Sequence, residues 1–98
     1  MKFALYFTLA AQEALTELKN SSHLQKHFKA VVKTLRYLSE NPRHPSLQTH
    51  KYKSIKGPQG EEVFEAYAEQ NTPAAYRVFF IYGPQRNTIT IIAITPHP

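Results

Sequence analysis

The sequence predicts an α+β fold, in which two N-terminal helices pack on one face of a four- to five-stranded antiparallel sheet in the order β-α-α-β-β-β. Between residues 22 and 41, apolar side chains recur with the period of an amphipathic helix. After residue 60, apolar runs are separated by short segments rich in Gly, Pro and Asn, a pattern typical of consecutive antiparallel strands. The 98 residues are enough for one hydrophobic core, so we expect a single domain over 1–98.

The first predicted strand is Met1–Phe7. Three of its apolar residues alternate with other residues: Phe3, Leu5 and Phe7. Lys2 followed by apolar residues weakly resembles a signal peptide, but the period of two favours a strand. Thr8 has a side chain suited to cap a helix over residues 9–19.

The second predicted helix begins at Ser22, because Gln25 three residues later completes a capping box. Its apolar residues share one face: Leu24, Phe28, Val31, Leu35 and Leu38. Its basic residues lie on roughly the opposite face: Lys26, Lys29, Lys33 and Arg36. The helix is expected to end near Asn41, because Pro42 disfavours helical geometry in the residue before it.

Sheet is predicted for the rest of the chain. Residues 47–55 form a weak strand or an extended, basic arm, and Gly57-Pro58-Gln59-Gly60 is a strong turn signal. Three strands connected by short loops follow at 61–69, 75–82 and 88–95. With helices on one face of the sheet, the uncovered face is where we expect a ligand to bind.

Composition narrows the functional classes. The chain contains no cysteine, which excludes disulfides and zinc–thiolate sites and fits a reducing cytoplasm. No apolar run approaches the roughly 20 residues that a membrane helix needs. His23 and His27 have the spacing of helical metal ligands, but flanking a basic stripe is the simpler explanation. We therefore expect a cytoplasmic protein that binds neither metal nor membrane.

Positive charge is concentrated in the middle of the chain. The net charge is +5, yet residues 19–56 contain nine basic residues against one acidic residue, a formal charge of +8. Such asymmetry favours a polyanionic partner, which could be a nucleic acid, a ribosome or an acidic protein. A solvated helix face is the simpler alternative for this charge.

Arg77 and His97 are the residues that suggest a reaction. Arg77 lies in the penultimate predicted strand, and His97 follows the last strand between Pro96 and Pro98. A permanent cation and an imidazole that titrates near neutral pH, on adjacent strands of a basic protein, suit phosphodiester chemistry on RNA. The alternative is a solvated arginine and a frayed end of the strand.

The order of these elements and motifs resembles the RelE/ParE superfamily of bacterial toxins from toxin–antitoxin systems, particularly the ribosome-dependent mRNA endoribonucleases of the RelE, HigB and YoeB branch. The basic second helix runs into Glu40-Asn41-Pro42-Arg43-His44-Pro45-Ser46, and an extended basic segment follows. Tyr76-Arg77-Val78-Phe79-Phe80 and Ile94-Thr95-Pro96-His97-Pro98 complete the resemblance, which covers essentially the whole chain.

The resemblance implies a reaction without metal or cofactor, in which the ribose 2′-OH attacks the adjacent phosphate. This reaction needs a base for the 2′-OH, a cation for the phosphorane and an acid for the leaving 5′-oxygen. By the resemblance, Arg77 would stabilise the phosphorane charge and His97 would be the general acid. It also implies a cognate antitoxin, mRNA and the ribosome as partners.

The sequence departs from the family at a pair of strand lysines, whose positions are occupied by Glu65 and Tyr67. Glu65 could be the general base, as a carboxylate is in some relatives, or it could pair with Arg77 or a lysine across the strands. Lys51 and Lys53 could bind RNA, or they could be solvated lysines that deter pairing at a sheet edge.

Further candidates for RNA binding are His50, Arg43 and Tyr67, and stacking on a base is possible for Tyr52, Tyr67 and Tyr82. Two alternatives to the nuclease remain. One is a non-enzymatic protein, either a ParE-like gyrase inhibitor or a degenerate member that keeps the fold and the antitoxin contact. The missing lysine pair favours it, whereas Arg77 and His97 favour the nuclease. The other is a general basic RNA-binding domain, which explains only the charge.

Overall fold

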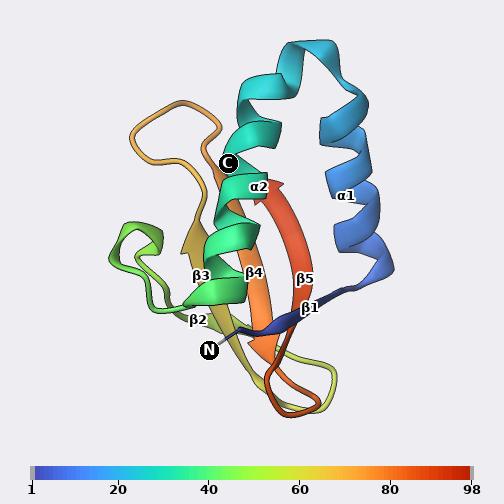
Figure 1. Ribbon diagram of the computed structural model, residues 1–98, viewed down its shortest axis with the longest axis vertical. Coiled ribbons are helices and arrows are strands. Elements are labelled where there is room, and N and C mark those ends of the chain that lie inside the picture. Colours follow the sequence, from blue (N-terminus) through green and yellow to red (C-terminus); the bar gives the residue numbers. More distant parts are fainter. Residues whose placement is uncertain (1, 98) are drawn as a thin grey trace.

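The computed structural model describes residues 2–97 and contains two helices and one sheet (Figure 1). The elements are β1 (Ala4–Phe7), α1 (Leu9–Asn20), a 3-10 turn at Ser22–Leu24, α2 (Gln25–Glu40), a 3-10 turn at Pro45–Leu47, β2 (His50–Lys56), β3 (Glu62–Tyr67), β4 (Tyr76–Tyr82) and β5 (Thr88–Pro96). Met1, where the first strand was expected to begin, and Pro98 lie outside the described residues. No helix between residues 2 and 97 is long and apolar enough to cross a membrane.

The sheet has five strands in the order β1-β5-β4-β3-β2. Three neighbouring pairs are antiparallel, as expected, but β1 runs parallel to β5, with Ala4 opposite Thr88 and Phe7 opposite Ile91. The sheet is therefore mixed. The parallel pair follows from the path of the chain. After β1, the two helices connect to β2 at the far edge of the sheet, and three antiparallel steps from β2 through β3 and β4 then place β5 beside β1.

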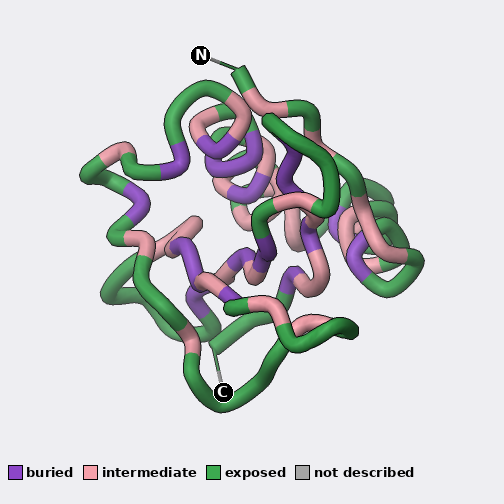
Figure 2. Tube along the Cα trace, turned by 90° about the horizontal axis from the view of Figure 1, so that it is seen from below, coloured by how far each residue is buried: buried purple, intermediate pink, exposed green. Residues whose placement is uncertain are grey.

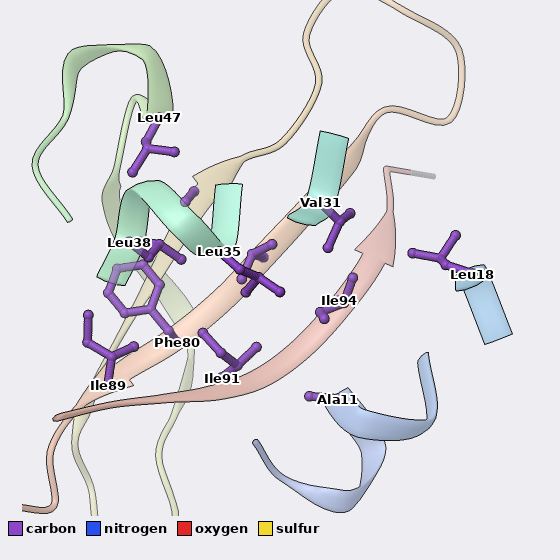
Figure 3. Close-up of a cluster of buried hydrophobic side chains, with 12 residues drawn as sticks. Ala11, Leu18, Val31, Leu35, Leu38, Leu47, Phe80, Ile89, Ile91 and Ile94 are labelled. Carbon is purple, nitrogen blue, oxygen red and sulfur yellow. The ribbon is translucent and has the colours of Figure 1, made fainter. Parts of the chain in front are cut away.

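The core lies between the helices and one face of the sheet, and the predicted α+β arrangement is confirmed. From α2, Val31, Leu35 and Leu38 are buried in one cluster with Phe80 and Ile91 (Figure 3). Leu24 and Phe28 contact this cluster and are partly buried, while the four basic residues of α2 are exposed. Buried positions follow the inner sides of the helices and the central strands, and the connecting loops are largely exposed (Figure 2).

Two of the helix boundaries predicted from the sequence are confirmed, and one is wrong. Thr8 caps α1 by accepting a hydrogen bond from the Ala11 amide, and α2 ends at Glu40 with Asn41 as its cap. The predicted capping box is wrong, because Ser22 begins a 3-10 turn and α2 begins only at Gln25. The Gln25 side-chain amide instead donates to backbone carbonyls at the end of α1 and in the turn that follows.

Substitution of Leu38 by Ala should reduce the free energy of unfolding by about 2–5 kcal/mol, because the side chain is fully buried and its removal leaves a cavity. Leu9→Ala is the matched control, since Leu9 is also helical but 71% exposed, and its effect should stay within about 0.5 kcal/mol. Urea unfolding followed by circular dichroism measures both. Equal losses in the two variants would contradict the packing of α2 on the sheet.

Candidate functional site

The face of the sheet opposite the helices carries a polar cluster built from three adjacent strands. In the strand register, His50 of β2 lies opposite Glu65 of β3, and Tyr67 of β3 lies opposite Arg77 of β4. Side chains of a strand alternate between the two faces, so Glu65 and Tyr67 share this face while Ala66 between them points into the helix-covered core.

Glu65 is the centre of this cluster. Its side chain is only 2% exposed, and its Oε2 accepts a hydrogen bond from Arg77 Nη1. Its other oxygen, Oε1, lies 2.8 Å from His50 Nε2. A buried carboxylate is costly unless it is paired, and these two partners supply the pairing. This geometry favours the cross-strand ion pair over a general base in contact with substrate, because both oxygens face protein partners away from solvent.

His50 is held by contacts at both ring nitrogens. His50 Nδ1 lies 3.0 Å from the carbonyl oxygen of Gln48, and a carbonyl can only accept, so Nδ1 is the donor in this contact. Nε2 faces Glu65 Oε1 at 2.8 Å. The ring therefore links the segment before β2 to the buried carboxylate.

Arg77 is held from two sides. Besides its ion pair with Glu65, its guanidinium carbon lies 5.0 Å from the centre of the Tyr67 ring, within the range of a cation–π contact. The same ring and the His50 ring meet in a T-shaped contact, with 5.6 Å between centroids. The Arg77 side chain is 20% exposed, so the charge is positioned but still reaches the surface.

The structure brings Arg77 and His97 to the same cavity. This small cavity, of about 280 Å³, is lined by both residues together with Tyr67, Gln48 and part of the β3–β4 loop. The backbone N–H of His97 donates to the carbonyl of Ala75 at 2.7 Å, which continues the pairing of β4 and β5 beyond Pro96. His97 itself is exposed.

Lys51 lies on the other side of the sheet. Its register partner is Phe64, which packs against the helix-covered core, and it lines a separate large cavity of about 770 Å³ together with Arg43. Lys53 is exposed on the edge strand β2, and neither lysine lines the small cavity. Lys51 therefore does not lie beside Arg77, because adjacent residues of a strand point to opposite faces and its neighbour His50 faces Glu65.

An ion pair that sequence reasoning missed supports the β3–β4 loop. His27 of α2 lies 2.7 Å from a carboxylate oxygen of Glu69, and the same oxygen accepts the backbone N–H of Tyr76 at 3.0 Å. Burial, followed by the carboxylates of Glu17 and Glu69, raises the pKa of the Tyr76 phenol. His27 thus ties α2 to a loop that borders the small cavity, rather than only flanking the basic stripe.

Gln48 is a second residue that the sequence did not single out. It lines both cavities, its carbonyl binds His50, and its φ of 48° places it in the left-handed region. A glutamine in a polar connecting segment carries no sequence signal for this position. No group of three or more His, Cys, Asp or Glu side chains in the part of the chain that is described could hold a metal ion.

Replacement of Glu65 by Gln should lower the free energy of unfolding by about 1.5–3 kcal/mol, the range for hydrogen bonds to charged groups. The amide keeps the shape of the side chain but loses the charge that pairs with Arg77 and His50. Glu62→Gln is the control, because its bond to Lys56 lies at the surface and surface pairs contribute about 0–1 kcal/mol. Equal denaturant midpoints for Glu65→Gln and the unsubstituted protein would show that this pairing adds nothing to stability.

The sequence matches no protein-family model and no curated protein, but the fold is found in solved structures. The RelE toxin in the archaeal RelE–RelB complex of Pyrococcus horikoshii is similar at a TM-score of 0.66 and 16% identity, over 98% of this chain and 96% of that one. A YoeB/ParE toxin from Agrobacterium tumefaciens is similar at a TM-score of 0.70 and 10% identity, over 98% of this chain and 100% of that one. YoeB in the YoeB–YefM heterotetramer of Staphylococcus aureus is similar at a TM-score of 0.67 and 14% identity, over the whole of both chains. The chain therefore has the fold of RelE and YoeB toxins.

Proposed function

We propose that this protein is the toxin of a toxin–antitoxin pair and cleaves mRNA on the ribosome by attack of the ribose 2′-OH, without a metal ion. The proposal rests on one observation. Arg77 and His97 line the same small cavity, on the face of the sheet that the helices do not cover. The similarity to RelE and YoeB toxins over nearly the whole chain supports it.

Arg77 is assigned the stabilisation of the phosphorane. A guanidinium stays protonated at every physiological pH, and Glu65 and Tyr67 hold this one in place before substrate arrives. A preorganised cation stabilises developing negative charge without reorganisation cost during the reaction. In this role Glu65 is a positioning residue that acts through Arg77.

His97 is assigned the protonation of the leaving 5′-oxygen. It is exposed, it shares the small cavity with Arg77, and an imidazole can deliver a proton near neutral pH. The backbone bond to Ala75 fixes the residue at the end of β5, whichever side chain it carries.

An acidic antitoxin segment is the proposed protein partner. The basic residues of α2 are exposed along a continuous helix, and residues 19–56 carry a formal charge of +8 from nine basic residues and one acidic residue. The similar RelE and YoeB structures were solved in complexes with RelB and YefM. Neutralisation of this charge would favour a comparable complex here.

A non-enzymatic protein is the second candidate, acting as a gyrase inhibitor or binding an antitoxin alone. Its support is specific: by the resemblance to the toxin family, Glu65 stands at a position where several members carry lysine. The carboxylate of Glu65 also compensates part of the charge of Arg77. The similarity to a YoeB/ParE toxin is compatible with either activity.

Substitution of His97 by Ala should reduce the rate of mRNA cleavage on ribosomes about 10²–10⁴-fold, the range for loss of a general acid. His23→Ala is the matched control, because His23 is exposed in the turn between the helices and should leave cleavage unchanged. Arg77→Gln should reduce the rate of mRNA cleavage about 10²–10³-fold. The glutamine retains a hydrogen-bond donor for Glu65, so we expect this variant to fold. Mapping of RNA 5′ ends after induction in bacteria, with circular dichroism of each variant, measures these effects.

If His97→Ala and Arg77→Gln both leave cleavage and growth arrest intact in folded protein, the assignment of these two residues to catalysis is overturned. Growth arrest without any new RNA 5′ ends, equal in the variants, would instead support the non-enzymatic protein.

A further inference from the structure

The large cavity has no role in the proposed cleavage site. It lies on the helix-covered side of the sheet, where the loop after α2 faces the start of β2, the first half of β3 and the end of β4. Its volume of about 770 Å³ falls within the roughly 300–1,000 Å³ typical of small-ligand sites. Its size alone therefore permits a ligand as large as a nucleotide.

Its polar lining is cationic. Arg43 and Lys51 line it and are exposed, and neither takes part in an ion pair with another residue of the 2–97 range. No Asp or Glu is among the described lining residues. Arginine and lysine without acidic neighbours are suited to bind a phosphate group.

His44 adds an oriented ring to this lining. Its Nδ1 accepts the backbone N–H of Ser46 at 3.1 Å. The ring stacks on Tyr37 at 4.3 Å between centroids and 7° between planes, which fixes its orientation. The cavity thus offers a fixed imidazole ring beside its two cations.

Another part of the lining, which we call the aromatic wall, consists of aromatic rings. Phe64 and Tyr82 line it with their rings 5.1 Å apart, and Tyr82 is 39% exposed although it is a large side chain at the end of a central strand. Burial raises the pKa of the Tyr82 phenol, and the positive charge of Arg43 offsets part of this rise. A bare phosphate would leave this wall unused, whereas a nucleotide has a base to place against it.

The two cavities share part of their lining. Gln48 lines both of them, and His50 lines the large cavity while its Nε2 contacts Glu65 on the other face. An RNA strand that passes Gln48 would therefore border both cavities.

We propose that the large cavity binds one nucleotide of the RNA strand whose scissile phosphate lies at Arg77 and His97, with its phosphate on Arg43 and Lys51 and its base against Tyr82 and Phe64. This assignment rests on the proposed function, and it names a substrate contact that lies outside the cleavage site. A free nucleotide has the same chemistry, so the test separates the two sources.

The test uses two probes on the full chain: adenosine monophosphate, and an adenosine trinucleotide with 2′-O-methyl riboses, which lacks the attacking hydroxyl and cannot be cleaved. Binding is followed by NMR titration of backbone amides. The trinucleotide should bind at least about tenfold more tightly than the monophosphate, because it also contacts Arg77. It should shift the amides of Arg43, Lys51 and Tyr82.

Arg43→Gln and Lys51→Gln should each weaken trinucleotide binding by about tenfold, the loss expected for one charge-assisted hydrogen bond. Arg86→Gln is the matched control, because Arg86 is exposed in the β4–β5 turn and lines neither cavity. Equal affinity in Arg43→Gln and Arg86→Gln would overturn the site. Binding of the monophosphate as tight as that of the trinucleotide would overturn the assignment to an RNA strand.

These outcomes are independent of the cleavage assay. If trinucleotide binding depends on Arg43 and Lys51 while the unsubstituted protein does not cleave mRNA, the nucleotide site stands and the nuclease assignment fails. If cleavage depends on His97 while Arg43→Gln leaves trinucleotide binding unchanged, the nucleotide site fails alone.

Discussion

The buried carboxylate of Glu65 connects three strands at the open face of the sheet. Its charge can be buried only with partners, and these come from the strands on either side: Arg77 on β4 and His50 on β2. The neighbours of Glu65 along β3, Phe64 and Ala66, face the core instead. The same three strands therefore support an apolar core on one side and a charged site on the other.

This arrangement has opposite effects on Arg77. The ion pair compensates part of its positive charge, but it also holds the side chain in one position together with Tyr67. A guanidinium has five N–H donors, and the ion pair with Glu65 uses one nitrogen, Nη1. Further donors on an ordered side chain suit a preorganised phosphate site, which is why we favour the nuclease over a binding protein.

Local signals in the sequence predicted much of the fold. The apolar stripe of α2, the Thr8 cap and the strand around Arg77 follow from neighbouring residues alone, and the pairing of Glu65 with Arg77 was one of two alternatives. The parallel position of β1 and the side of the sheet that Lys51 occupies were not predictable in this way. Both depend on pairing between distant segments, and a shift of one residue at the start of β2 reverses which side chains face the core.

A double-mutant cycle between Glu65 and Arg77 tests most directly whether this buried pair organises the site. Urea unfolding of Glu65→Gln, Arg77→Met and the double variant gives the coupling energy, with the surface pair Lys56 and Glu62 as a reference. We predict a coupling of about 1–3 kcal/mol for the buried pair and below about 0.5 kcal/mol for the surface pair. Coupling below about 0.5 kcal/mol in both pairs would contradict the account, because Arg77 would then not depend on Glu65 for its position.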